Sequence, residues 1–404
     1  MVALSVFLGL VAAVLLLPTL SDLSSLVRIA LGRRPRVRPP PAQPPKILFL
    51  VPAHDEELLI ESCLRSLSTL DYPRARYDVT VIADNCTDGT ATLARAAGAQ
   101  CLERDDPTHP GKPRAIAWAL PQLATHQYDG VVIIDADATV DQGFALALAT
   151  ANPLRDKVLQ PYNDVHNRGD NALSRMAAVF AAVTYRISFR LKRRAGLNVP
   201  VSAGMCIGAG VLAAHPWNAF SLSEDWELYA WLTAAGVPID YVEPAHLYAQ
   251  EARSLRQSAS QRQRWTAGKL AVLRTTYPTL VRSRRIGVGQ KLDALAELSA
   301  PGPAVHLGVV AVLSMLAWLQ HLSGGPIVSL ALWASLLRPV VHTLLALGSD
   351  PEPWRALGAF AFLPIYTVWR LGTLVASLRM IGDKPWVRTE RHAPTSSANG
   401  GSGI

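Results

Sequence analysis

The chain has 404 residues, of which 50% are hydrophobic, and its mean hydropathy of +0.19 is too apolar for a wholly soluble protein. Part of it is therefore expected in a membrane. The formal net charge of +8 would suit nucleic acid or an anionic lipid surface, but the arginines lie beside apolar runs, so we expect lipid and no nucleic-acid partner. Four cysteines without C-x-x-C spacing indicate free thiols in a reducing compartment, not a zinc site or a disulfide framework.

The N-terminal stretch predicts a membrane-spanning helix. No charged side chain occurs from residue 2 to residue 21, and about 20 apolar residues suffice to cross a bilayer. A cleaved signal peptide is disfavoured because the stretch lacks a basic start and a small-x-small exit. Arginines crowd its far side, at Arg28, Arg33, Arg34, Arg36 and Arg38. By the positive-inside rule the N-terminus then lies outside, and the residues after the arginines lie in the cytosol.

Two strand–loop–helix units follow a proline-rich spacer. The first strand, residues 46–51, leads into the polar loop 52–57 and a helix with apolar residues at helical spacing. The second strand, residues 79–83, leads into the loop 84–90 and another helix. Acidic side chains therefore stand at the carboxyl end of each strand: Asp55 and Glu56 after the first, Asp84 and Asp88 after the second.

A third strand, residues 131–134, is followed by Asp135 and Asp137. Its four consecutive β-branched residues predict a strand buried on both faces, as in a parallel sheet covered by helices. An Asp-x-Asp pair alone is weak evidence, but in an extended chain both carboxylates can face one divalent cation that carries substrate phosphates. Parallel crossovers would bring all three acidic loops to one edge, the predicted nucleotide site. The alternative, acids that cap the following helices, would explain Asp55 or Asp88 alone.

A basic helix start lies between the second and third strands. Lys112 and Arg114 precede an Ala- and Leu-rich helix, where free backbone N–H groups favour phosphate. Either residue is equally well explained as surface charge. The chain has no P-loop motif and no G-x-G-x-x-G after a strand, so neither a P-loop nor a dinucleotide-binding fold is supported.

Two further stretches come after the third strand. Residues 172–197 mix apolar and basic side chains and predict a basic amphipathic helix, which lies on the membrane or packs under the domain. The glycine-rich residues 203–210 contain no phosphate-binding lysine, so we interpret their small side chains as room for a sugar or acceptor beside the backbone.

Two later motifs are candidates for chemistry. Ser223 can cap a helix, and the carboxylates that follow it, beside Trp226, can equally supply a general base for a sugar hydroxyl. Gln261, Arg264 and Trp265 share one helix face that suits a phosphate-bearing leaving group or a stacked acceptor, and this face favours the chemical interpretation. Three neighbouring cations are expected to be solvated or membrane-facing: Arg256, Arg262 and Lys269.

Five motifs occur in the order found in membrane-bound family 2 glycosyltransferases, which include cellulose, chitin and hyaluronan synthases and ceramide glucosyltransferases. They are Pro52-Ala-His-Asp-Glu-Glu57, Ala83-Asp-Asn-Cys-Thr-Asp-Gly-Thr90, Asp135-Ala-Asp137, Glu224-Asp225 and Gln261-x-x-Arg264-Trp265. Each is unspecific alone, but together, over about residues 46–275, the chain resembles this family. The resemblance implies an α/β fold of the GT-A type, a nucleotide-sugar-binding domain with a mostly parallel sheet, plus transmembrane and interfacial helices.

The resemblance also implies roles for single residues. Asp84 would contact the uracil or ribose, Asp135 the diphosphate, and Asp137, with Asp135, a Mg²⁺ or Mn²⁺ ion. Asp225 would be the catalytic base. The other residues expected at the donor are Pro52, Ala53, His54, Glu56, Lys112, Gln261, Arg264 and Trp265. Those expected at the acceptor are Glu224, Trp226 and Trp265.

The C-terminal part predicts further membrane helices. Residues 298–337 carry no charged side chain and are broken by a Ser-Gly-Gly-Pro segment, which predicts a pair of spans. Arg338 and His342 in the second span are candidates for contact with a lipid acceptor, with snorkelling as the equal alternative. The apolar stretch 356–369 is short for a span and predicts an interfacial helix.

Seven segments are therefore expected along the chain. They are a transmembrane helix (1–27), a basic and proline-rich linker (28–45), a cytosolic catalytic domain (46–275), an interfacial connection (276–302), a transmembrane helix pair (303–348), an interfacial helix (354–380) and a cytosolic tail (381–404). Three spans leave the basic C-terminal segment in the cytosol, as the charge rule requires.

The expected activity is inverting transfer of a sugar from a nucleotide donor, UDP first, to a lipid, lipid-linked or polysaccharide acceptor. The expected place is the cytosolic face of a bacterial-type inner membrane. Three spans favour the addition of one sugar or few, and a processive polysaccharide synthase is the alternative. A nucleotidyltransferase would need a Lys- and Gly-rich loop near the first strand that is missing, and a membrane receptor would not need acids at three strand ends.

Overall fold

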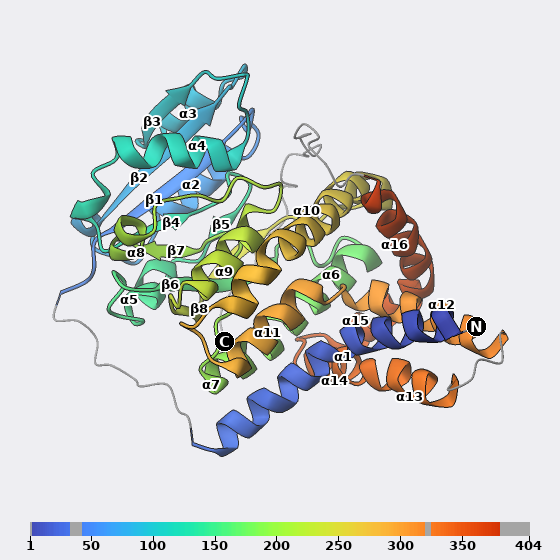
Figure 1. Cartoon of the computed structure of the whole chain (residues 1–404). Coiled ribbons are helices and arrows are strands. Elements are labelled where there is room, and N and C mark those ends of the chain that lie inside the picture. The colour runs from blue at the N-terminus through green and yellow to red at the C-terminus, as the bar shows by residue number, and fades with distance from the viewer. Residues whose placement is uncertain (1, 33–42, 320–324, 380–404) are drawn as a thin grey trace.

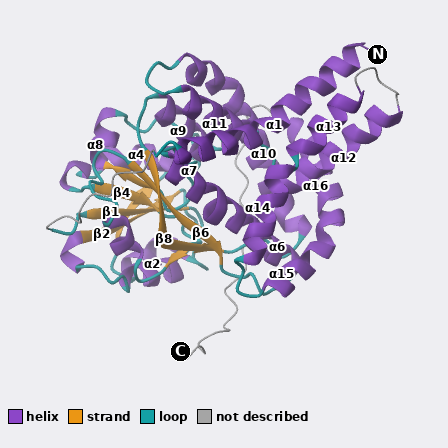
Figure 2. Cartoon of the chain, turned by 90° about the horizontal axis from the view of Figure 1, so that it is seen from below, coloured by secondary structure: helices purple, strands orange, loops and turns teal. Residues whose placement is uncertain are grey.

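The computed structural model describes residues 2–32, 43–319 and 325–379 of the chain. A sheet domain occupies one side of the molecule, and long helices gather on the other side (Figure 1). Figure 2 shows the same division from below, with the strands grouped away from the N-terminal helix. Most of the predicted linker and the predicted tail lie outside the described residues.

The domain is built on one eight-stranded sheet of order β3-β2-β1-β4-β7-β6-β8-β5. The strands are β1 (Ile47–Ala53), β2 (Tyr77–Asp84), β3 (Gln100–Arg104), β4 (Gly130–Ile133), β5 (Thr139–Val140), β6 (Val158–Val165), β7 (Cys206–Gly208) and β8 (Ile239–Ala249). Strands β1 to β4 run parallel to one another, β7 lies antiparallel between β4 and β6, and β5 lies antiparallel to β8. The predicted α/β class with a mostly parallel sheet is confirmed, and the three predicted strands correspond to β1, β2 and β4.

Both faces of the sheet are covered by helices, as the β-branched runs predict. Alternate residues of β1 enter two separate cores: Leu48 and Leu50 face one, and Phe49 and Val51 face the other. The helices on the first core are α4 (Lys112–Ala119), α8 (Ala209–Ala214) and α9 (Glu224–Ala234). Those on the second are α2 (Ile60–Ser68), α3 (Thr90–Ala96) and α5 (Phe144–Ala149). Short 3₁₀ turns occur at Arg74–Arg76, Leu120–Gln122 and Thr125–Gln127.

The second part of the molecule is helical. It contains α1 (Val2–Ala30), α6 (Ala172–Ala182), a π-helix (Val183–Phe189), α7 (Arg190–Ala195), α10 (Leu255–Arg282), α11 (Val288–Ser299), α12 (Pro303–Leu319), α13 (Gly325–Ser335), α14 (Leu337–Gly348), α15 (Pro353–Ala359), a 3₁₀ turn (Phe360–Phe362) and α16 (Leu363–Leu378). Among the residues that the structure describes, three helical segments are long and apolar enough to cross a membrane: Leu4–Ala30, Ile327–Gly348 and Pro353–Leu378. A fourth is possible if α11 and α12, which meet at a bend of 80°, form one broken span.

The segment Pro353–Leu378 differs from its prediction. The sequence predicts an interfacial helix there because the apolar stretch is short for a span. The helical segment is 26 residues long, however, and like α1 it is long and apolar enough to cross a membrane. The argument from length is therefore wrong. The interfacial placement of this segment stays a prediction.

Buried ion pairs join the membrane-type helices α1 and α14 to α7 and α11. Arg338 of α14 lies 3.1 Å from Asp22 of α1 and 3.0 Å from Glu297 of α11, and His342 also contacts Asp22. Arg338 and His342 therefore pair with protein carboxylates, which neither of their two interpretations, contact with a lipid acceptor or snorkelling, anticipated. Lys192 of α7, 2% exposed, completes the network by pairing with Glu297 and Asp293.

Two stretches with open interpretations serve packing. The basic helix of residues 172–197 lies under the domain, because its cations pair with protein carboxylates such as Glu243. The glycine-rich stretch makes room for the chain itself. A Cβ on Gly208 would lie 2.2 Å from the carbonyl oxygen of Leu154 and one on Gly210 2.8 Å from that of Arg155, so our interpretation of these residues as space for a sugar is wrong.

Candidate active site

The loops after β1 and β2 hold each other in place. The Asp55 carboxylate accepts a hydrogen bond from the backbone N–H of Thr87 at 2.6 Å, and the Asp88 carboxylate accepts from that of Thr90 at 2.9 Å. Asp55 has a φ of 51°, which few non-glycine residues adopt without such support. Both acids therefore organise the loops. Neither is the N-cap of the following helix, as the structural alternative supposed, because Leu59 and Gly89 occupy those positions.

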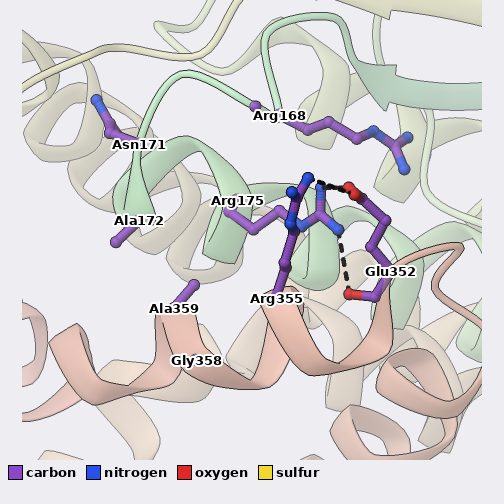
Figure 3. A pocket seen from close by; sticks show the side chains of 9 residues that line it. Arg168, Asn171, Ala172, Arg175, Glu352, Arg355, Gly358 and Ala359 are labelled. Atoms are coloured by element: carbon purple, nitrogen blue, oxygen red, sulfur yellow. Dashed lines mark hydrogen bonds and ion pairs between the residues drawn. The ribbon is translucent and has the colours of Figure 1, made fainter.

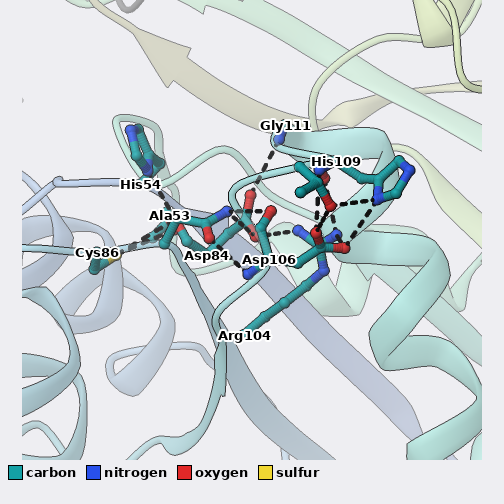
Figure 4. A network of polar contacts seen from close by, with 10 residues as sticks. Ala53, His54, Asp84, Cys86, Arg104, Asp106, His109 and Gly111 are labelled. Atoms are coloured by element: carbon teal, nitrogen blue, oxygen red, sulfur yellow. Dashed lines mark hydrogen bonds and ion pairs between the residues drawn. The ribbon is translucent and has the colours of Figure 1, made fainter.

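Asp84 anchors a buried network at the end of β2 (Figure 4). One carboxylate oxygen pairs with the Arg104 guanidinium at 2.5 Å, and the other accepts from the backbone N–H of Gly111 at 3.2 Å. The backbone carbonyl of Asp84 lies 2.7 Å from Nδ1 of His54. Arg104, 6% exposed, was missed because β3 was not predicted, although it too ends a strand. The predicted donor residues of the first two loops are thus brought together, and their contact with a nucleotide stays a prediction.

Lys112 connects this network to the rest of the site. Gly111, at φ 112°, makes the turn into α4, a conformation that favours glycine. The Lys112 ammonium then lies 2.6 Å from Asp135 Oδ1 and 3.2 Å from Glu224 Oε1. Burial lowers the pKa of Lys112, but the charges of Asp135 and Glu224 outweigh it and raise this pKa overall. We call Lys112, Asp135, Glu224 and Asp225 the Lys112 cluster.

Asp225 lies in the first turn of α9, where the sequence allowed either a cap or a base. Ser223 stands at the cap position, but its hydroxyl makes no capping hydrogen bond. One Asp225 oxygen accepts from the N–H of Trp226 at 2.8 Å. Burial, followed by the charge of Glu224, raises the pKa of Asp225 to about 7. This carboxyl group is therefore poised to exchange a proton near neutral pH.

Helix α10 supports the start of α9. Gly268 packs so closely that a Cβ there would lie 2.2 Å from the Ser223 hydroxyl. The Lys269 ammonium lies 4.2 Å from the centre of the Trp226 ring and donates to the carbonyl of Ala300. Burial lowers the pKa of Lys269 to about 8. The prediction of a solvated or membrane-facing Lys269 is wrong, because it lies against this ring beside the candidate base.

The predicted Gln261, Arg264 and Trp265 face lies on α10, one turn before these contacts. Trp265 is 45% exposed, and the guanidinium of Arg262 lies 5.0 Å from its ring centre. Arg262 also pairs with Glu251 at 2.9 Å, so the expectation that Arg262 is solvated or membrane-facing is wrong. The position of the Gln261, Arg264 and Trp265 face over a donor or acceptor stays a prediction.

Asp137 is separated from Asp135 by a turn. The N–H of Ala138 donates to the carbonyl of Asp135, so the chain is not extended there and that premise of the metal-site prediction is wrong. Asp137 instead lines a hollow of about 50 Å³ with Cys63 and His166. Burial, and then the charges of Asp137 and Asp135, raise the pKa of the Cys63 thiol.

A divalent cation at Asp135 and Asp137 stays a prediction, because the Asp135 carboxylate is paired with Lys112. Two carboxylates, completed by substrate phosphates and water, are the oxygen ligands that Mg²⁺ commonly takes in nucleotide sites. Another group of potential ligands lies within the described residues, at Asp55, Cys86 and Asp88. Its two carboxylates already accept hydrogen bonds from backbone N–H groups of their loops.

Sequence comparisons identify related proteins. The family model described as "Glycosyltransferase like family 2" matches residues 44–268. The probable glycosyltransferase YdaM of Bacillus subtilis is 24% identical over 246 residues, which cover 57% of this chain and 56% of that protein. The beta-monoglucosyldiacylglycerol synthase of Nostoc sp. is 29% identical over 196 residues, 46% of this chain and 40% of that protein. The chain thus spans about half the length of the curated relatives it matches.

A solved structure shares the fold of nearly the whole chain. It is the mannosyltransferase PcManGT from Pyrobaculum calidifontis in complex with GDP-Man and Mn²⁺, with a TM-score of 0.59. The alignment covers 94% of this chain and 98% of that one at 19% sequence identity. At this identity the likeness shows the fold, and it confirms the predicted GT-A type.

Removal of the Lys112 charge tests the geometry of the cluster. Lys112→Met should lower the free energy of unfolding by about 2 kcal/mol at pH near 8, less than the 3–5 kcal/mol of a fully buried pair because Lys112 is partly exposed. The loss should shrink as the pH falls below about 7, since protonated carboxyls no longer repel one another. Denaturant unfolding in detergent measures both, with Lys112→Arg as the charge-retaining control. A loss of equal size at both pH values would contradict this geometry.

Proposed function

We infer the function of this protein from one premise: the chain belongs to the family 2 glycosyltransferases, whose model matches more than half of it. We propose that it transfers a hexosyl or N-acetylhexosaminyl group from a nucleotide donor to a lipid or lipid-linked acceptor, with inversion. The observation that carries this proposal is the Lys112 cluster. It places a cation for a diphosphate, a metal-type carboxylate and a carboxyl group of near-neutral pKa beside one another.

The donor would bind at Gly111 and Lys112, which join the network around Asp84 to the Lys112 cluster. The ordered loops around Asp84 would receive the nucleoside, which we propose to be uridine. Lys112 would exchange part of its contact with Asp135 for the diphosphate, since phosphate oxygens are strong acceptors for an ammonium group. Arg264 and Gln261 on α10 would close over the same diphosphate.

Asp137, with Asp135, would hold Mg²⁺ or Mn²⁺. The ion would supply a Lewis acid that stabilises the departing diphosphate. The mannosyltransferase of the same fold is in complex with Mn²⁺, which supports a divalent cation here.

Asp225 would act as the general base. It would take the proton from the acceptor hydroxyl while the acceptor oxygen bonds to the anomeric carbon and the bond from that carbon to the nucleotide breaks on the opposite face. Attack from the opposite face gives inversion, and no covalent enzyme intermediate is needed. Burial keeps the carboxylate basic, and Trp226 and Glu224 would flank the acceptor.

A lipid acceptor is supported by the architecture and by one relative. Among the described residues, three helical segments are long enough to span a membrane, or four with the bent pair, and their helices contact α6, α7 and α10. One curated relative is a glucosyldiacylglycerol synthase. So few spans suit the addition of one sugar or few better than an enclosed polymer channel, and we propose that the active site faces the cytosolic membrane surface, where nucleotide sugars are made.

Neutralisation of the proposed base tests its role. Asp225→Asn should reduce transfer by about 10²-fold or more, the contribution of a positioned base, with donor affinity retained. Single-turnover transfer and nucleotide-binding calorimetry separate the two effects. Glu224→Gln, one residue away, is the matched control and should cost less in rate. A purified Asn variant with full activity would refute the assignment, and a larger loss in the Gln variant would move the base to Glu224.

The raised pKa of Asp225 predicts the pH dependence. Only the deprotonated carboxylate can accept a proton, so kcat/KM should fall about tenfold per pH unit below about 7 and level off above it. Because the Glu224 charge helps to raise this pKa, Glu224→Gln should shift the acidic limb to lower pH. A rate profile that stays flat between about pH 5 and 8 would count against Asp225 as the titrating base.

A further inference from the structure

A hollow of about 380 Å³ lies between the start of α6 and α15 (Figure 3). Its charged lining consists of three arginines, Arg168, Arg175 and Arg355, and one carboxylate, Glu352, and small residues form most of the remainder. None of these residues belongs to the candidate active site. Their charges therefore need an explanation of their own.

Arg168 is neutralised by Asp164 at 2.6 Å, so the two guanidinium groups that concern the hollow are those of Arg175 and Arg355. Arg175 is 7% exposed and pairs with Glu352 at 2.9 Å and Asp350 at 3.0 Å, but its Nε has no hydrogen-bond partner among the described residues. Arg355 shares Glu352 at 2.6 Å, and 79% of its side chain is exposed. Figure 3 shows both guanidinium groups converging on this one carboxylate. A planar guanidinium pair that shares one acceptor suits a phosphate group, which offers several oxygens at once.

The hollow lies beside apolar helices that face outward. Helix α15 begins a candidate membrane segment and follows another that ends at Gly348. Trp354 and Leu357, on either side of Arg355, are 81% and 49% exposed. Exposed aromatic and aliphatic side chains next to arginine are typical of the membrane–water interface, where lipid headgroups lie.

We propose that this hollow binds the phosphate of an anionic phospholipid headgroup. Arg175, held by its buried ion pairs, forms the fixed floor, and Arg355 closes on the phosphate from the exposed side. Glu352 competes with the lipid for both arginines. Free phosphate shares the chemistry, but the exposed apolar residues beside Arg355 favour a lipid. The inference does not depend on sugar transfer, because it concerns binding at a separate place.

Binding of short-chain phosphatidylglycerol to the purified full chain in a neutral detergent tests this site. Arg355→Gln should weaken binding about tenfold, the effect of one lost charge-assisted contact. Glu352→Gln should tighten binding, since it removes the competing carboxylate, whereas a purely structural role of Glu352 predicts no gain. Arg284→Gln, which removes an exposed arginine outside the hollow, is the matched control and should leave the affinity within about twofold.

Three results would overturn the proposal. The first is equal binding by the Arg355→Gln and Arg284→Gln variants, and the second is weaker binding by Glu352→Gln. The third is displacement of the lipid by an equal concentration of inorganic phosphate, which would assign the hollow to free phosphate. These measurements need no donor or acceptor sugar. They therefore test the lipid site even if the proposed glycosyltransfer is wrong.

Discussion

One ammonium group, that of Lys112, holds the candidate site together. It lies between a carboxylate that follows β4 and a carboxylate at the start of α9, two places almost 90 residues apart in the chain. The residue before it, Gly111, is fixed by Asp84 at the end of β2. The dipeptide Gly111-Lys112 therefore joins the half of the sheet that we propose to bind the nucleoside to the half that we propose to carry out transfer. Without it, like charges on Asp135, Glu224 and Asp225 would repel one another in a partly desolvated space.

The same argument extends to the membrane side. Asp225 is followed by Trp226, which Lys269 covers, and Lys269 lies on the long helix α10 that packs against α9 and α16. On the opposite side, Arg338 and Lys192 connect α14 and α7 through carboxylates of α11. Buried pairs of this kind cost much desolvation and require good geometry, so they specify one docking of the membrane-type helices on the domain. An acceptor held at the lipid surface would then meet the base at a defined height.

Local patterns in the sequence predict strands and helix faces, because these depend on the spacing of neighbouring side chains. The β-branched runs before Asp84 and Asp135 predict strands, and the three polar residues of α10 predict a helix face, because side-chain spacing determines each. The partners of buried charges are not predictable in this way. Arg104 meets Asp84 across two neighbouring strands, and Lys269 meets Trp226 between two helices, so only the folded chain reveals these contacts.

Errors in the predictions share a cause. The turn at Asp137 depends on a backbone hydrogen bond from Ala138, and the space beside Gly208 is filled by the chain at Leu154. A turned and an extended chain at Asp137, or a filled and an open space beside Gly208, are compatible with the same pattern of apolar and polar residues. The motif Asp135-Ala-Asp137 still predicts that acidic side chains follow β4. It does not predict the direction in which each carboxylate points.

A structure of the full chain with Mn²⁺ and a nucleoside diphosphate would test the central claim most directly. The account predicts metal density at Asp137, diphosphate oxygens within hydrogen-bonding distance of the Lys112 ammonium, and Asp225 facing the open side of that diphosphate. Nucleotide and metal bound instead at Asp55, Cys86 and Asp88, with the contacts of Lys112 to Asp135 and Glu224 unchanged, would contradict it.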